Sequence, residues 1–160
     1  MREINLHTKI AVYLLEECSE VEKKLIEAAK EATKKAYVPY SHFRVGAALL
    51  LENGEVIAGN NQENAAYPSG LCAERTTLFF ANANFPDQKV VTIAIAAWYN
   101  GEFTRDAITP CGACRQVLLE TENRFHTPVK VLMYSKEGIY VVSAIKDLLP
   151  LSFGDEMLKK

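Results

Sequence analysis

Short apolar segments suited to β-strands alternate along this chain with longer segments of helical periodicity. Residues 43–51 form a dense apolar run, and Asn53-Gly54 is a hairpin signal that should turn the chain into a second strand over residues 55–60. We also expect strands over residues 89–98, 129–134 and 139–142, helices over 21–37, 72–80 and 110–123, and a short helix after Ser143. Strands that alternate with helices favour an α/β sandwich with a mixed sheet.

The N-terminal residues are predicted to add another strand. From Ile4 to Leu14 the even positions are Ile, Leu, Thr, Ile, Val and Leu, a period of two residues. Ser19-Glu20-Val21-Glu22 then fits a capping box, and the helix that follows should end near Tyr37, before Val38-Pro39. A length of 160 residues suits one domain. We therefore expect a single domain over residues 1–160, of which residues 1–18 are an N-terminal extension that contains a strand.

Composition and charge argue against membrane and polymer partners. The net charge is −2, and nucleic-acid-tracking surfaces need clustered Lys and Arg. No apolar run approaches the roughly 20 residues of a membrane span. The start, Met1-Arg2-Glu3-Ile4-Asn5, lacks the basic and apolar regions of a secretory signal. We therefore expect a cytoplasmic protein, in which four cysteines indicate metal ligands or free thiols more often than disulfides.

Three cysteines have the spacing of a catalytic zinc site. Cys111 and Cys114 are three residues apart at an expected helix start, so both side chains can face one point. Cys72 opens another expected helix, and helix N-termini favour thiolates. Taken singly, Cys72 would be a buried apolar residue, and the pair a redox couple or half of a structural zinc site. Together they match three zinc ligands that leave a fourth position open for water, with one Zn²⁺ per chain.

The residues beside these ligands suggest how the site works. Glu74 lies two residues after Cys72, where a carboxylate can move protons to and from water at the metal. Three thiolates around Zn²⁺ leave a formal charge of −1, which a neighbouring Arg75 or Arg115 could offset by hydrogen bonding to sulfur. We favour Arg75; the alternative is a surface arginine. A C-x-E segment followed by P-C-x-x-C is the thiolate form of the zinc-deaminase signature.

In four motifs with matching order and spacing, the chain resembles the small, homotetrameric cytidine deaminases. The resemblance runs from about Ala36 to Phe153. Its motifs are residues 37–48 (YVPYSHFRVGAA), 59–67 (GNNQENAAY), 72–76 (CAERT) and 110–118 (PCGACRQVL), closed by Leu148-Leu149-Pro150 and Phe153. It implies a three-layer α/β/α sandwich around a central five-stranded mixed sheet. It also implies that Cys72, Cys111 and Cys114 bind zinc and that Glu74 is the proton shuttle.

The resemblance further implies a substrate pocket shared between subunits. Phe43 would stack on the pyrimidine, Asn61 and Glu63 would hydrogen-bond the ribose, and Ala65, Tyr67 and Phe153 would help to build a neighbouring subunit's pocket. The chain departs from the family at Asn60, where many relatives have Cys, and at Gln62, which lies between the two ribose contacts and could tune them. The first roughly 20 residues extend beyond the family's usual start.

These features predict hydrolytic deamination of free cytidine and deoxycytidine, with a homotetramer as the assembly and no nucleic acid or membrane partner. A carboxylate such as Glu63 suits a sugar hydroxyl and repels phosphate, which favours a nucleoside. Two alternatives stay open. One is a related deaminase for another aminopyrimidine or aminopurine, which would use the same catalytic residues. The other is a non-catalytic zinc-binding module, which would have a closed four-ligand site and no need of Glu74.

Overall fold

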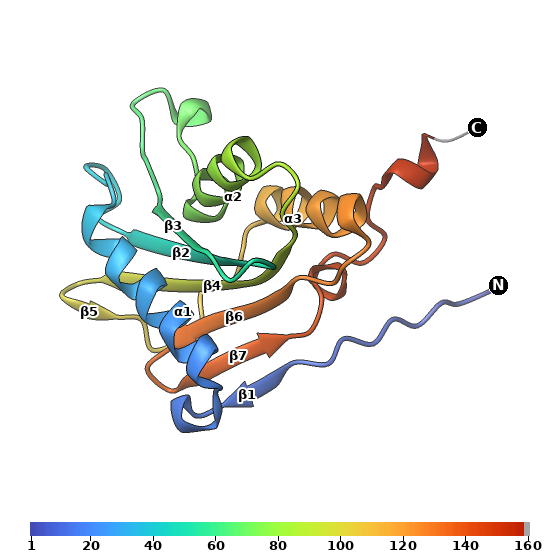
Figure 1. Cartoon of the computed structure of the whole chain (residues 1–160), viewed down its shortest axis with the longest axis horizontal. Coiled ribbons are helices and arrows are strands. Elements are labelled where there is room, and N and C mark those ends of the chain that lie inside the picture. Colours follow the sequence, from blue (N-terminus) through green and yellow to red (C-terminus); the bar gives the residue numbers. More distant parts are fainter. Residues whose placement is uncertain (159–160) are drawn as a thin grey trace.

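A computed structural model describes residues 1–158, which form a mixed sheet between two layers of helices (Figure 1). The sheet has seven strands in the order β1-β7-β6-β4-β2-β3, with β5 paired to β4. The strands are β1 (Ala11–Tyr13), β2 (Arg44–Leu51), β3 (Val56–Asn60), β4 (Val90–Tyr99), β5 (Glu102–Phe103), β6 (Lys130–Ser135) and β7 (Gly138–Val142). The helices are α1 (Glu20–Ala32), α2 (Ala73–Asn84) and α3 (Gly112–Phe125), and 3₁₀ helices include η3 (Tyr67–Ser69) and η4 (Ile145–Leu148).

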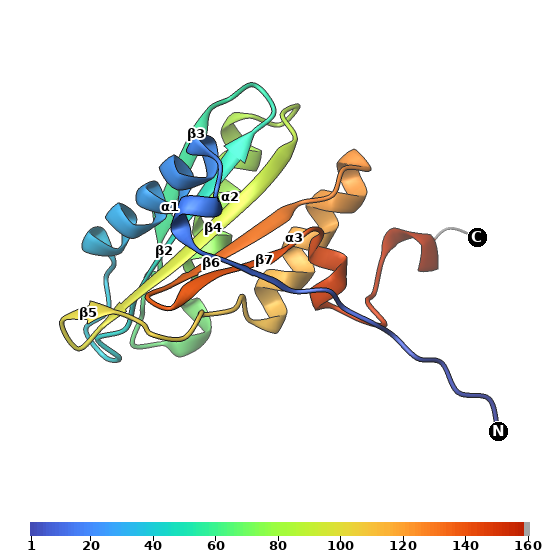
Figure 2. The ribbon, with the colours of Figure 1, turned by 90° about the horizontal axis from the view of Figure 1, so that it is seen from below.

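The predicted α/β/α sandwich is confirmed. Helix α1 lies on one face of the sheet, and α2 and α3 lie on the other (Figures 1 and 2). Strands β4 and β6 run parallel, and the remaining paired strands run antiparallel. The β4–β6 connection contains α3, as a crossover between parallel strands requires. The expected five strands are β2, β3, β4, β6 and β7.

Two strands differ from the sequence prediction. The N-terminal strand covers Ala11–Tyr13 rather than residues 4–14, because its partner β7 ends at Val142 and the chain then turns into η4. The two-residue strand β5 lies between the expected strand over residues 89–98 and the expected helix over residues 110–123, where we expected no strand, and it pairs with β4 through Trp98 and Tyr99.

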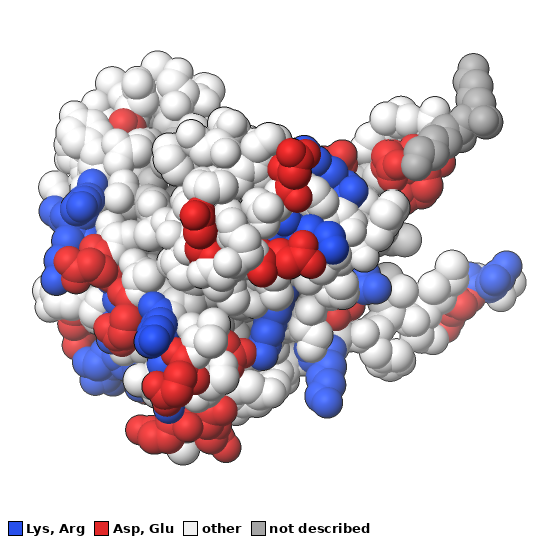
Figure 3. All heavy atoms as spheres, viewed as in Figure 1, with Lys and Arg blue, Asp and Glu red and all other residues white. Residues whose placement is uncertain are grey.

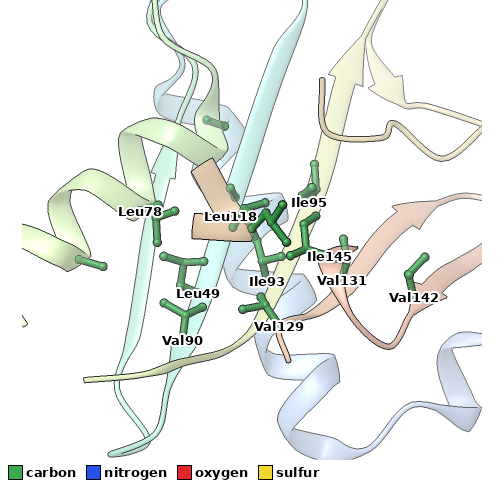
Figure 4. Packing of buried hydrophobic residues seen from close by; sticks show 14 of the residues in the cluster. Leu49, Leu78, Val90, Ile93, Ile95, Leu118, Val129, Val131, Val142 and Ile145 are labelled. Carbon is green, nitrogen blue, oxygen red and sulfur yellow. The ribbon is translucent and has the colours of Figure 1, made fainter. Parts of the chain in front are cut away.

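The two apolar cores lie on opposite faces of the sheet. Figure 4 shows part of the core under α2 and α3, where Leu78 and Leu118 point toward Leu49 and Ile93 of the central strands. The other core lies under α1 and is built on alanines, including Ala48, Ala94 and Ala96. Gly46 brings α1 close to β2, because a Cβ atom there would lie 2.0 Å from the carbonyl oxygen of Ala29. Small side chains on the central strands therefore set the position of α1.

Glu122, in the last turn of α3, holds two loops against the helix. Its Oε2 accepts hydrogen bonds from the backbone N–H of Val129, at 3.1 Å, and of Ile145, at 2.8 Å. The side chain is buried, and both N–H groups are buried with it. Buried backbone donors without a partner are costly, so this carboxylate fixes the start of β6 and of η4 relative to α3.

We predict that Glu122→Ala lowers the free energy of unfolding by about 2 to 4 kcal/mol, because two buried N–H groups lose their acceptor. Glu120→Ala is the matched control, since Glu120 lies on the same helix but is exposed. Urea unfolding followed by circular dichroism measures both variants. Equal stability of the two variants would show that Glu122 is not a structural acceptor.

Candidate metal centre and substrate pocket

Two helix N-termini bring the three predicted zinc ligands together. Cys72 is the N-cap residue of α2, Cys111 is the N-cap residue of α3, and Cys114 lies in the first turn of α3. All four cysteines of the chain are free thiols. The Sγ atoms of Cys72, Cys111 and Cys114 lie within 4.8 Å of one another. Within residues 1–158 this is the one group of three or more His, Cys, Asp or Glu side chains that could hold a metal.

The sulfur geometry fits zinc. The Sγ of Cys111 is 3.8 Å from that of Cys72 and 3.6 Å from that of Cys114. A tetrahedral ion with Zn–S bonds of about 2.3 Å separates its sulfur ligands by ~3.8 Å. A hydrogen bond from Cys114 lowers the pKa of Cys72 to about 5, with a further contribution from Arg75. The same interaction raises the pKa of Cys114. Three thiols thus share one point, and one of them ionises readily.

Glu74 lies beside this cluster in the first turn of α2. Its side chain is 5% exposed, and burial raises the pKa of its carboxyl, with the charge of Cys72 acting in the same direction. Glu74 is not part of the metal-ligand cluster. A buried carboxyl with a raised pKa, beside a group of metal-ligating thiols, is suited to take up and release a proton in turn.

The two candidate arginines have different surroundings. Arg75 places Nη2 3.8 Å from the Sγ of Cys72 and donates to it. Arg115 instead donates to backbone carbonyls, from Nε to Pro110 at 2.7 Å and from Nη1 to Leu148 at 2.9 Å. Arg75 is thus placed to offset thiolate charge, whereas Arg115 ties α3 to the C-terminal segment.

A pocket of about 500 Å³ opens beside Cys72 and Arg75. Residues 61–64 form one wall, and Gly70 and Leu71 extend it. Tyr40, Ser41 and Tyr67 complete its lining. Gln62 shares backbone hydrogen bonds of 2.9 Å with Leu71, which holds this wall next to the start of α2. The pocket therefore contains the predicted ribose contacts Asn61 and Glu63 together with the predicted zinc ligand Cys72.

The polar residues of this wall are held in place. The Oδ1 of Asn61 accepts from the backbone N–H of Val45, and its Nδ2 donates to the carbonyl of Phe43. The Oε2 of Glu63 accepts from the backbone N–H groups of Tyr40, at 2.9 Å, and Ser41, at 3.3 Å. A hydrogen bond from the Ser41 side chain is the main reason why the pKa of Glu63 is lowered. Glu63 therefore carries a negative charge in the pocket.

Gln62 points its side chain toward the end of β3. Its Nε2 donates to the Oδ1 of Asn60 at 2.6 Å, and Asn60 in turn donates to the carbonyl of Ala32 at 3.2 Å. The two positions at which the chain departs from the family pattern thus contact each other. Their hydrogen bonds join the pocket wall to the end of α1.

Phe43, the predicted stacking residue, is not part of the pocket lining and pairs instead with an aromatic residue that the sequence did not single out. Its ring lies 5.6 Å from the ring of Tyr99, at an interplanar angle of 44°. Tyr99 ends β4, whose Trp98 pairs with Arg44 across the sheet, and this register brings the two rings together. Tyr40 and Ser41 were also missed as pocket residues. Both residues contact Glu63, which lies more than 20 residues further along the sequence, so local patterns do not reveal this contact.

The residues predicted to serve a neighbouring subunit lie on the surface. Tyr67 is 76% exposed and packs edge to face on Tyr40, with ring centroids 6.2 Å apart. Ala65 is exposed and is not part of the pocket lining. Phe153 is 56% exposed and lines a separate cavity beside α2 and α3, with Phe79 and Val117. Within the described residues, Phe153 does not reach its own subunit's substrate pocket.

The chain matches known proteins over most of its length. Residues 19–127 match the family model for the cytidine and deoxycytidylate deaminase zinc-binding region. The chain is 43% identical over 132 residues to the cytidine deaminase of Halalkalibacterium halodurans, covering 82% of this chain and 93% of that protein. It is 40% identical over 136 residues to the cytidine deaminase of Sporosarcina psychrophila, covering 85% and 93%.

Solved structures agree with this assignment. The cytidine deaminase of Burkholderia pseudomallei superposes with a TM-score of 0.69 at 43% identity, over 81% of this chain and 97% of that one. The cytidine deaminase of Mycobacterium tuberculosis superposes with a TM-score of 0.66 at 32% identity, over 83% and 97%. The three-cysteine cluster, the buried Glu74 and these matches together show that the chain belongs to the cytidine and deoxycytidylate deaminase family.

Proposed function

We propose that this chain is a zinc-dependent cytidine deaminase, which hydrolyses free cytidine and deoxycytidine to uridine and deoxyuridine with release of ammonia, as in pyrimidine salvage. The observation that carries the proposal is the three-sulfur cluster at two helix N-termini with buried Glu74 beside it. Three protein ligands leave a coordination position for water, as catalytic zinc sites do.

The site residues divide the chemistry between them. Cys72, Cys111 and Cys114 would hold one Zn²⁺ per chain, which acidifies water by acting as a Lewis acid. Glu74 would take one proton from the attacking water and deliver it to N3 of the cytosine ring while the water oxygen bonds to C4. Glu74 would then take the second proton from that oxygen and pass it to the amino group, so that the C4–N bond breaks, ammonia leaves and a C4 carbonyl remains. The balance is cytidine and water in, uridine and ammonia out.

The pocket wall suits a nucleoside. Glu63 is ionised and accepts hydrogen bonds, so it can accept from a sugar hydroxyl and would repel a phosphate. Asn61 keeps one N–H and one oxygen lone pair for a ligand after its contacts with Phe43 and Val45. Gln62 stands between them, held by Asn60, and we assign it to the same sugar-binding wall. Phe43, backed by Tyr99, would offer a ring face to the base.

A mixed surface charge supports a small substrate. On the face seen in Figure 3, Lys and Arg side chains are interspersed with Asp and Glu, especially over α1. Polymer binding would favour a continuous positive stripe. In the part of the chain that the structure describes, no helix has the length and apolarity to cross a membrane. Free thiols at the site suit a reducing compartment, so we place the enzyme in the cytoplasm.

We further propose a homotetramer with shared active sites. Tyr67 and Phe153 expose most of their apolar surface to solvent within one subunit, and exposed apolar surface of this kind often lies at a contact between subunits. The pocket beside Cys72 is open, and a second copy could supply the missing wall and exclude water. Closed two-fold symmetry is the common arrangement for such tetramers.

The first prediction separates the proton shuttle from the ligands. Glu74→Gln should keep zinc and fold but lose roughly 10²–10⁴-fold in kcat, because the amide cannot carry the proton. Cys111→Ala is the comparison variant and should lose zinc and activity together. Zinc content by atomic absorption and ultraviolet monitoring of cytidine measure the two effects. Zinc loss in Glu74→Gln, or near-normal turnover, would contradict this assignment.

The second prediction concerns the sugar. Cytidine and deoxycytidine should both react, whereas cytidine monophosphate and single-stranded DNA should be poor substrates. Glu63→Gln should raise KM for cytidine about 5- to 10-fold, because a charged acceptor is replaced by a neutral one. Glu52→Gln, in the β2–β3 turn, is the matched control. Efficient deamination of either polyanion by the parent enzyme would refute the role of Glu63.

The third prediction concerns assembly. Phe153→Ala should lower activity and loosen the tetramer without changing zinc content, since Phe153 lies away from the metal ligands. Met157→Ala, which is also exposed in the C-terminal tail, should have little effect. Light scattering and turnover at the same concentration test both variants. A fully active monomer would rule out shared sites.

A further inference from the structure

The N-terminal arm, residues 3–14, carries an apolar face that nothing covers in the described structure. The arm runs from the free end of the chain to β1 and extends away from the body (Figures 1 and 2). Its even-numbered apolar side chains are all more than half exposed: Ile4 72%, Leu6 59%, Ile10 51%, Val12 55% and Leu14 60%. The family match begins only at residue 19, so the arm lies outside the shared domain.

The two faces of the arm have different surroundings where it joins the sheet. Ala11 and Tyr13 pack on the core under α1. Val12 points to the opposite face, where its pairing partner on β7 is the half-exposed Tyr140. The apolar face of the arm therefore continues onto the sheet. A contiguous apolar surface of this kind usually marks a site of interaction with another molecule.

The arm also presents an open strand edge. Strand β1 is the last strand of the sheet, and among residues 1–158 no ladder partner lies on its outer side. Natural proteins usually blunt such edges with charged residues or proline. Here the even positions carry no charge between Ile4 and Leu14. The partner of this surface must therefore offer both a strand edge and apolar side chains.

A second copy of this chain offers both features in matching positions. Glu3 and Lys9 are placed symmetrically about Leu6, so an antiparallel pair of arms centred on Leu6 sets each Glu3 opposite Lys9 of the other copy. Among the described residues neither side chain forms an ion pair within its own subunit. The arm is thus complementary to itself in charge as well as in apolar pattern.

The arm is also continuous with the segment that we assign to the subunit interface. Thr8 donates from Oγ1 to the carbonyl of Asp147 in η4, at 2.8 Å, and η4 leads into the tail that carries Phe153. The N-terminal arm and the C-terminal tail leave the body on the same side (Figure 1). A contact made by the arm would therefore lie next to the contact between subunits that we assign to Phe153 and the C-terminal tail.

We propose that two copies of this chain join through residues 2–10 of their N-terminal arms, antiparallel across a two-fold axis. The pairing satisfies backbone groups of residues 2–10 in both arms, sets the two Leu6 side chains opposite each other and places each Ile4 opposite Thr8 of the other copy. The proposal rests on the homo-oligomer suggested above, but it concerns a segment that takes no part in the chemistry.

The test compares two double variants of the full-length zinc enzyme. Ile4→Ser with Leu6→Ser removes the two apolar side chains at the centre of the proposed contact. Asn5→Ser with His7→Ser introduces the same serine residues on the opposite face of the arm. Sedimentation equilibrium should show a dissociation constant at least about tenfold higher for the even-numbered pair and less than about threefold higher for the odd-numbered pair. Lys9→Glu should also weaken association, and adding Glu3→Lys to it should restore association.

Zinc content and cytidine turnover, measured on the same samples, keep the proposals apart. An assembling parent enzyme whose association is unchanged by Ile4→Ser with Leu6→Ser would overturn the arm proposal and leave the deaminase intact. A monomeric parent enzyme that deaminates cytidine would overturn both the arm contact and the shared sites. An enzyme that assembles through its arms but does not act on cytidine would overturn the proposed function and support the arm contact.

Discussion

The meeting of two helix N-termini at three sulfur atoms is the constraint on which the rest of the site depends. Cys72 caps α2 and Cys111 caps α3, so the partial positive ends of both helices face the point where thiolates gather. This arrangement requires α2 and α3 to lie on the same face of the sheet with their first turns adjacent. The parallel β4–β6 pair meets that requirement, because α3 crosses between these strands over the face that α2 also covers.

The sheet also positions the pocket beside the three cysteines. The register of β2 with β4 brings Phe43, which lies outside the lining of this pocket, to Tyr99. The bridge between Gln62 and Leu71 brings the wall that we assign to the sugar to the start of α2. Glu63 and Asn61 each form two hydrogen bonds with backbone groups of residues 40–45. The groups assigned to the sugar are therefore held in position before a ligand arrives, which lowers the entropy cost of binding.

Local chemistry allowed much of this to be predicted from the sequence. The Asn53-Gly54 turn, the capping box at Ser19 and the cysteines at helix starts each act over a few residues, and the structure contains the turn and the helices at these places. Contacts between distant segments could not be predicted in the same way. A glutamate in an amphipathic helix is ordinarily solvated, so nothing in the local pattern marked Glu122 as a buried acceptor. The alternating apolar pattern at the N-terminus is likewise longer than the strand that forms there, because the length of β7 limits how many residues can pair with it.

The central claim is that three thiolates hold zinc and leave one position for water. Zinc-edge X-ray absorption of the purified enzyme tests it most directly, because the technique counts the atoms bound to the metal and distinguishes sulfur from oxygen. We expect three sulfur atoms at about 2.3 Å and one oxygen atom at about 2.0 Å from the zinc ion. Four protein ligands with no oxygen from water would contradict the account, since a closed site has no place for the reacting water.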